Sequence, residues 1–165
     1  MQEVPRAAIA QKVAERPQRL RAAIERVRDG DRELLERLSS ECQRDRLPDG
    51  RRPAQDRGLR ARQRGAERDA GALAAAVGRP SVTILGVDAY PTFDDKAAAL
   101  LYSLVRNHSL VAGNQRLAWA ATRVICILNG RDMSYSVDDA EALIQAAAGD
   151  TDVPELAIWI REHLR

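Results

Sequence analysis

The chain has 165 residues, of which 45% are apolar and 30% are charged, and its net charge is +2. This length fits one domain with an appended segment, and the apolar content suffices for one core. No run approaches the ~20 consecutive apolar residues of a membrane span, and the first residues lack the apolar stretch of a signal peptide. We therefore expect a cytoplasmic protein that does not enter the membrane.

The two parts of the chain differ in charge. Residues 1–68 hold 18 basic and 12 acidic side chains, whereas residues 69–165 hold 8 and 12. Such an asymmetry indicates two different kinds of segment. The two cysteines, Cys42 and Cys126, have no metal-ligand spacing and indicate no disulfide framework. Cys126 falls in an apolar helical pattern and is predicted to be a small buried hydrophobe.

Short helices of unknown role are predicted over residues 1–42. Residues 5–16 form a first helix, which Pro17 interrupts, and residues 18–28 form a second. After a stop at a Gly, Asp31 is predicted to cap a third helix rich in leucine. These helices are thinly apolar, so we expect them to need a partner or the rest of the protein for stability.

Residues 43–67 have a different composition, rich in Arg, Gly, Pro and Gln and nearly free of apolar side chains. Composition of this kind is typical of a linker or a disordered segment. Residues 46–64 hold seven Arg and two Asp, so nucleic-acid binding is the alternative hypothesis. No aromatic residue is interleaved in this stretch, and we therefore favour the linker.

From Asp69 onward the pattern is regular and mostly helical. A helix over 70–77 is capped by Asp69 and ended by Gly78. Residues 79–92 contain a β-branched run followed by turn residues. Four further helices are predicted, with their expected limits as follows: Pro91 or Thr92 to Asn107, 114–128 ended by Asn129-Gly130, 137–148 capped by Ser136, and Asp152 or Pro154 to about Leu164.

The segment HSLVAGNQR, residues 108–116, joins two apolar helices and carries the residues best suited to chemistry. A helix that begins near Gly113-Asn114 directs free N–H groups and its positive dipole end at the turn, which favours an anion. Arg116 adds a guanidinium suited to phosphate. His108 could act as a general base near neutral pH. The combination predicts nucleotide-dependent transfer onto a hydroxyl.

The same segment resembles the signature of the Fic/Doc family, in its death-on-curing (Doc) toxin branch. The upstream run GALAAAVGRPSVTILGVDAYPTFDDKAAALLYSLVRNH is also similar, so the resemblance covers about residues 68–165. The positions in register are Asn107, His108, Leu110, Val111, Gly113, Asn114, Arg116, Trp119, Asn129 and Gly130. The resemblance implies a Fic-fold helical bundle over 68–165. It also implies that residues 79–92 form a β-hairpin flap that aligns a target segment, the alternative being an ordinary loop.

The resemblance implies a toxin of a toxin–antitoxin pair, with His108 as base and Gly113, Asn114 and Arg116 binding phosphate. Relatives transfer either a phosphoryl group or AMP from a nucleoside triphosphate to a protein hydroxyl. The Doc branch implies phosphoryl transfer to elongation factor Tu, with ATP as substrate and Mg²⁺ as the expected ion. The expected partners are a cognate antitoxin and the target protein.

Two departures from the family pattern affect this expectation. Active relatives carry Asp or Asn where this chain has Ala112, which has no oxygen for a hard cation. They often carry Lys where this chain has Gln115. Both changes predict impaired transfer, and the alternative is a catalytically decayed module that still binds nucleotide or an antitoxin. We therefore assign no metal ligand.

Residues 1–67 have no clear counterpart in this resemblance. Relatives begin with a leucine-rich helix just before the equivalent of Arg68, and that helix is missing here. Besides a linker, two further interpretations stay open. The segment could come from out-of-frame translation of a GC-rich gene, or it could be a fused, antitoxin-like segment.

Several other polar or aromatic residues are assigned structural roles. Trp119 and Trp159 are spaced for core faces, and His163 suits the dipole at the end of the last helix. Asp94 and Asp95 lie in the first turn of their helix and are expected to stabilise it, with a contact to the target as the alternative.

Overall fold

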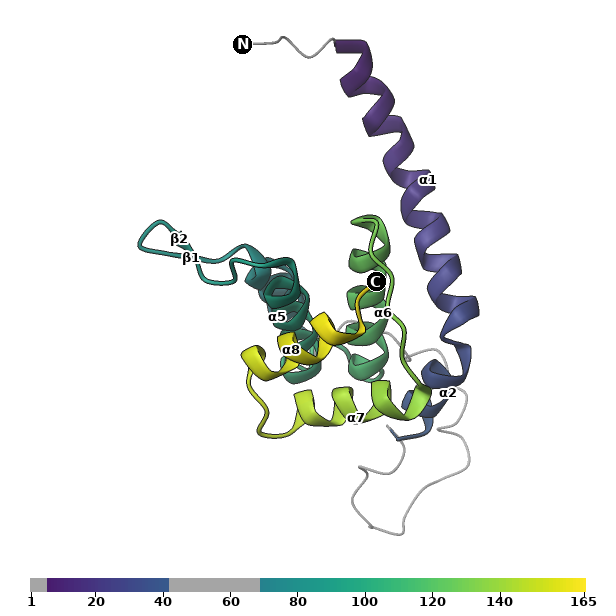
Figure 1. Ribbon diagram of the computed structural model, residues 1–165, viewed down its shortest axis with the longest axis vertical. Coiled ribbons are helices and arrows are strands. Elements are labelled where there is room, and N and C mark those ends of the chain that lie inside the picture. Colours follow the sequence, from purple (N-terminus) through teal and green to yellow (C-terminus); the bar gives the residue numbers. More distant parts are fainter. Residues whose placement is uncertain (1–5, 42–68) are drawn as a thin grey trace.

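The computed structural model describes residues 6–41 and 69–165, and the side chains from residue 15 to 39 and from 69 onward (Figure 1). The described part is a helical bundle with one small hairpin, as predicted. The elements are α1 (Arg6–Gly30), α2 (Arg32–Glu41), α4 (Ala70–Gly78), a 3-10 turn η1 (Arg79–Ser81), β1 (Thr83–Ile84), β2 (Val87–Asp88), α5 (Phe93–Arg106), α6 (Asn114–Leu128), α7 (Val137–Ala148) and α8 (Val153–His163). Residues 42–68, which include Cys42, the whole predicted linker 43–67 and its basic stretch 46–64, lie outside this description.

Helix α5 is the centre of the bundle and packs against α4, α6, α7 and α8. Its alanines Ala97, Ala98 and Ala99 are fully buried, and their small side chains let the neighbouring helices approach closely. Its start is fixed by a capping box, in which the Asp95 N–H donates to Thr92 Oγ1 at 3.1 Å and the Thr92 N–H donates to Asp95 Oδ2 at 3.1 Å. The predicted limits of this helix are confirmed.

The remaining helices after residue 69 also begin and end where the pattern predicted. Asp69 caps α4 by accepting the Ala72 N–H at 2.9 Å. Helix α6 covers the predicted 114–128, and α7 begins with a second capping box, formed by Ser136 and Asp139. These limits are readable from sequence because each capping motif lies within four residues of the backbone groups it satisfies.

The prediction that Pro17 interrupts the first helix is wrong. α1 runs through Pro17 as one helix from Arg6 to Gly30. Proline removes one backbone donor and costs about 3 kcal/mol in a helix interior. Residues 15–22 are exposed, so water can bond the carbonyl that is left without a donor. The helix is anchored further along, where Ala23 and Val27 are buried.

Helices α1 and α2 pack on the rest of the bundle. Leu34 and Leu38 belong to the same buried cluster as the residues of α5. Arg37 of α2 donates to Asp138 at 2.6 Å and to Glu141 at 3.2 Å, both on α7. The expectation that these helices rely on the main bundle therefore agrees with their packing.

The hairpin β1–β2 is present where the flap was expected. Thr83 pairs with Asp88 and Ile84 with Val87, and the turn residues Leu85 and Gly86 both have positive φ, 51° and 83°. Such a two-residue turn matches the twist of a tight hairpin. It projects from the bundle beside the start of α5 (Figure 1). Among the described helices, none combines the length and the apolar character that crossing a membrane requires.

Candidate functional site

The loop between α5 and α6, residues 107–113, is held by the start of α4. The Asn107 side chain donates from Nδ2 to the carbonyl of Ala72 at 3.1 Å. The Asp69 N–H donates to the carbonyl of Ser109 at 3.2 Å. Because the same Asp69 caps α4, the loop and that helix end form one hydrogen-bonded unit.

Asn114 fixes the other side of the loop. Its Oδ1 accepts the Leu110 N–H at 2.8 Å, and its Nδ2 donates to the Leu110 carbonyl at 3.1 Å. The Asn114 amide thus bonds both backbone polar groups of Leu110 and ties the loop to the first residue of α6. In this geometry the Asn114 side chain orients the loop, whereas the sequence had predicted that it binds phosphate.

Gly113 is the N-cap of α6 and has a φ of 89°, in the left-handed region that favours glycine. Among the residues that the structure describes, no side chain caps this helix end. A Cβ at Gly113 would meet no atom within 4 Å, so the space beside the helix end is open. The first N–H groups of α6 and their partial positive charge can therefore be approached by an anion.

His108 is exposed and also has a positive φ, of 46°. Within the described residues no hydrogen-bond partner of its imidazole is found. A residue with a Cβ in this region is strained, and such strain persists only where the surroundings impose it. Here the neighbouring Asn107 and Ser109 are both bonded to α4, so the backbone at His108 has little freedom.

A pocket of about 560 Å³ lies against this loop. The described residues that line it are Leu38 of α2, Val105 and Arg106 of α5, His108, Leu110 to Gln115, and Ala148 of α7. The structure therefore brings together His108, Gly113 and Asn114, three of the predicted site residues. Arg116 is exposed and does not line this pocket, whereas Ala112 and Gln115 do.

The residues of the pocket do not fit a Mg²⁺ site. None of its described lining residues is Asp or Glu, and Ala112 stands where a ligand was expected. Two side-chain amides line it, those of Asn114 and Gln115, and Asn114 Oδ1 already accepts the Leu110 N–H. Throughout the described residues, no cluster of three or more His, Cys, Asp or Glu could hold a metal. We therefore assign no step to a metal ion.

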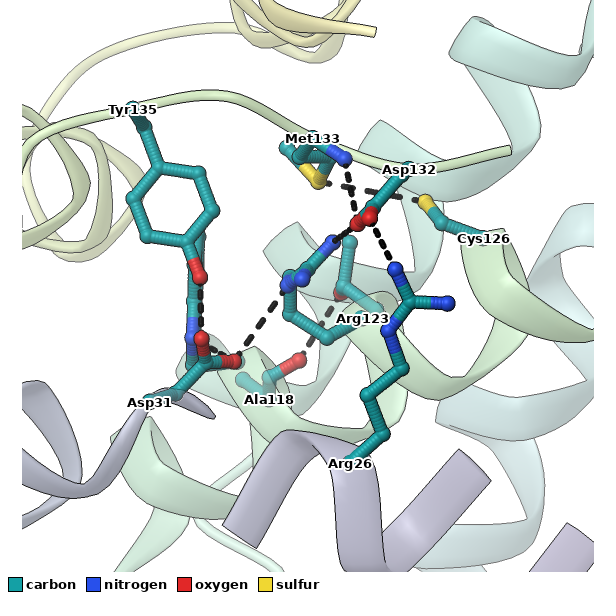
Figure 2. Close-up of polar contacts among 10 residues, drawn as sticks. Arg26, Asp31, Ala118, Arg123, Cys126, Asp132, Met133 and Tyr135 are labelled. Atoms are coloured by element: carbon teal, nitrogen blue, oxygen red, sulfur yellow. Dashed lines mark hydrogen bonds and ion pairs between the residues drawn. The ribbon is translucent and has the colours of Figure 1, made fainter. Parts of the chain in front are cut away.

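A buried polar network, which sequence reasoning missed, holds the other end of α6 (Figure 2). Asp31, between α1 and α2, is 6% exposed, and its carboxylate accepts from three side chains. Trp119 Nε1 and Arg123 Nε donate to Oδ2 at 3.1 and 3.3 Å, and the Tyr135 hydroxyl donates to Oδ1. Burial, and then the bond to Asp31, raises the pKa of Tyr135 above its usual value.

The network continues to Asp132 in the segment after α6. Arg123 Nη1 donates to Asp132 Oδ1 at 3.0 Å, the Met133 N–H donates to the same oxygen at 2.8 Å, and Arg26 of α1 bonds the other oxygen. Arg123 is only 6% exposed. Trp119 is fully buried against Tyr135, edge to face, so its predicted packing role is confirmed and a hydrogen bond to Asp31 is added.

Two acidic residues at the start of α5 have separate roles. Asp95 stabilises the helix start, as expected. Asp94 is 8% exposed and pairs with Arg131 at 3.4 Å and with Arg161 of α8 at 3.0 Å. These ion pairs tie the start of α5 to two distant segments, and they leave Asp94 largely shielded from a target.

Residues near the end of α8 and within α6 also serve the fold. The ring of His163 stacks on half-buried Trp159 at 3.7 Å between centroids, and its Nδ1 lies 2.8 Å from the Trp159 carbonyl oxygen. Cys126 is fully buried, as predicted, and burial raises the pKa of its thiol to about 11.

Comparison with known proteins identifies the family. The sequence model of the Fic/DOC family matches residues 32–126, more than half of the chain, and begins in α2, upstream of the expected start at 68. The protein named Toxin Doc from Mycolicibacterium smegmatis is 52% identical over 93 residues, which cover 54% of this chain and 72% of that protein. No solved structure matches. The family match includes the loop 107–113 and every described lining residue of the pocket except Ala148, and the chain belongs to the Fic/Doc family.

Proposed function

We propose that the protein is a Doc-type toxin that transfers a phosphoryl group, or AMP, from a nucleoside triphosphate to a hydroxyl of a target protein. The observation that carries the proposal is the pocket itself, which places His108 beside the open N-terminus of α6. Its volume of about 560 Å³ lies within the range of sites for small molecules and cofactors. A base and an anion site in one pocket are the two parts that such a transfer needs.

The chemistry assigned to these residues is as follows. The free imidazole of His108 accepts the proton of the target hydroxyl as the oxygen attacks phosphorus. A new oxygen–phosphorus bond forms, and the bond to the leaving phosphate oxygen breaks. Attack at the terminal phosphorus moves a phosphoryl group and releases the diphosphate, whereas attack at the first moves AMP and releases pyrophosphate. The N–H groups after Gly113 stabilise the negative charge on the transferred group.

The similarity to the protein named Toxin Doc of M. smegmatis supports a toxin with a cognate antitoxin as its partner. We propose phosphoryl transfer because the Doc-branch resemblance of residues 108–116 implies it. Elongation factor Tu is the proposed target, which would make the cytoplasm the place of action. In this proposal the exposed hairpin residues Ile84 and Val87, 63% and 69% exposed, align the target segment.

A second candidate function rests on the lining of the same pocket. Since no described lining residue is a carboxylate, the chain could be a decayed module that binds nucleotide or antitoxin without transfer. Transfer from labelled ATP to elongation factor Tu separates the two. The toxin hypothesis expects labelling that His108→Ala abolishes, and growth arrest on expression that the same substitution relieves.

The double variant Ala112→Asp with Gln115→Lys tests the same point from the other side. It restores a carboxylate and a cation to the pocket lining, so labelling should rise above that of the unmodified chain. If labelling by the wild type and by the double variant both stays at background, catalysis is rejected and the binding module remains. Labelling of the wild type that survives His108→Ala would instead reject His108 as the base.

A further inference from the structure

The pocket contains a basic side chain that the family resemblance did not single out. Arg106, in the last turn of α5, is the one Lys or Arg among its described lining residues. Arg116, the arginine expected to contact phosphate, does not line the pocket. The position matched by a lysine in many relatives is the uncharged Gln115. An anion in this pocket therefore meets its positive side chain at Arg106.

The environment of Arg106 holds the guanidinium without neutralising it. Its Cζ lies 5.1 Å from the centroid of the Tyr102 ring, and Nη1 donates to the carbonyl of Gly149 after α7. Within the described part of the chain Arg106 forms no ion pair. The side chain is exposed, and a guanidinium has five N–H donors, so most of them remain for a ligand.

Arg106 also stands close to the proposed base. It precedes His108 by two residues, and between them the Asn107 side chain is bonded to the Ala72 carbonyl. Arg106 and His108 thus line the same pocket from nearby positions on a restrained backbone. Planar guanidinium groups bind phosphate oxygens through two parallel hydrogen bonds, which fixes orientation as well as charge.

From this geometry we propose that Arg106 binds the phosphate chain of the nucleotide, as a positioning cation inside the pocket. The inference rests on the proposed function for the identity of the ligand, but it concerns a polyphosphate anion in general. Arg106 compensates for the charge that Gln115 lacks. The Tyr102 ring and the Gly149 carbonyl keep the guanidinium at the pocket wall, so little side-chain freedom is lost when the anion binds.

The test is isothermal titration calorimetry of the full chain with ATP and, separately, with inorganic tripolyphosphate. Arg106→Gln should weaken both by about tenfold or more, since hydrogen bonds to a charged group are lost. Arg106→Lys keeps the charge without the fork and should be intermediate.

The matched control is Arg79→Gln. Arg79 also faces the Tyr102 ring, 5.0 Å from its centroid, and carries the same charge, but it does not line the pocket. Its loss should change affinity less than about twofold, because a charge outside the pocket acts only through screened, long-range attraction. Thermal unfolding of each variant verifies that it is folded. If Arg106→Gln does not fold, the comparison of Arg106→Lys with wild type still tests the inference.

Equal affinities of the Arg106→Gln and Arg79→Gln proteins would overturn the inference, and so would a wild type that binds neither ligand. The transfer assay reports on the proposed function separately. Binding that depends on Arg106, without transfer, supports the inference and rejects the proposed enzyme activity. Transfer with binding that does not depend on Arg106 supports the enzyme activity and rejects the inference.

Discussion

Replacing Asp31 by Asn tests whether the buried network anchors the N-terminal helices to α6. The substitution keeps the size of the side chain and removes its charge. It also exchanges one carboxylate oxygen for an NH₂ group, although Trp119 and Tyr135 both donate to Asp31. At least one donor is therefore left facing another donor or without its acceptor.

The magnitude follows from what stays in place. Breaking a buried ion pair costs about 3–5 kcal/mol when the remaining charge is left alone. Arg123 keeps its bond of 3.0 Å to Asp132, so the lower end of that range applies. We expect a loss of about 3 kcal/mol in the free energy of unfolding. For a protein of this size that corresponds to a fall in Tm of roughly 6–12 °C.

The control is Asp29→Asn, two residues away. Its carboxylate pairs with Arg28 at 3.0 Å, but the two side chains are 56% and 67% exposed. Such exposed pairs contribute little to stability, because solvent screens the attraction. Urea unfolding followed by circular dichroism measures both variants against wild type. Losses of equal size at Asp31 and Asp29 would refute the reasoning.

Three further predictions concern single residues. In a Cys42→Ser background, Cys126 should react with a thiol reagent at pH 8 about 100-fold more slowly than in urea, because burial raises its pKa from 9.0 to about 11; equal rates would contradict this. Partial burial opposes the ionisation of Asp132, but the Met133 N–H and Arg123 outweigh it and hold its pKa below 3.8. Its contribution is therefore present above pH ~4 and lost as pH falls through the folded-state value. Unfolding curves of Asp132→Asn and wild type should differ at pH 7 and converge as the pH falls through that value. Gly113→Ala should lower the free energy of unfolding by about 1–2 kcal/mol through its φ of 89° alone, since a Cβ there meets no atom within 4 Å; an unchanged urea midpoint would reject that cause.

The helix limits after residue 69 were predictable because their signals are local. Thr92 with Asp95, and Ser136 with Asp139, satisfy backbone groups within the same turn, and each pair reads directly as a helix start. The hairpin turn at Leu85-Gly86 is local in the same sense, although the sequence alone left it open against an ordinary loop.

Asp31 shows why the rest could not be predicted. Its neighbours in sequence make it look like a helix cap, and a cap uses the carboxylate locally. Its actual partners Trp119 and Arg123 lie 88 and 92 positions further along the chain. No pattern within one helix reveals such a contact. The prediction that Pro17 ends the helix failed for a related reason. The packing of Ala23 and Val27 outweighs the low helix propensity of proline.

The candidate site divides in the same way. His108, Gly113 and Asn114 came from one short segment, and the structure gathers them at one pocket. The walls of the pocket come from elsewhere: Leu38 belongs to α2 and Ala148 to α7. Which side chains meet a ligand therefore depends on how four helices pack. Arg106 is close in sequence to His108, but it lies outside the segment 108–116 and only the pocket lining draws attention to it.

The conformation of His108 links the fold to the proposed chemistry. For a residue with a Cβ, a left-handed backbone costs about 1–2 kcal/mol, and at Gly113 the chain uses glycine for it. At His108 the strain is held by bonds on either side, from Asn107 to Ala72 and from Asp69 to Ser109. Those bonds restrain the backbone from which the imidazole projects. Glycine would carry no such strain at this position, so the chain keeps a strained histidine at the point where the proposed transfer places its base.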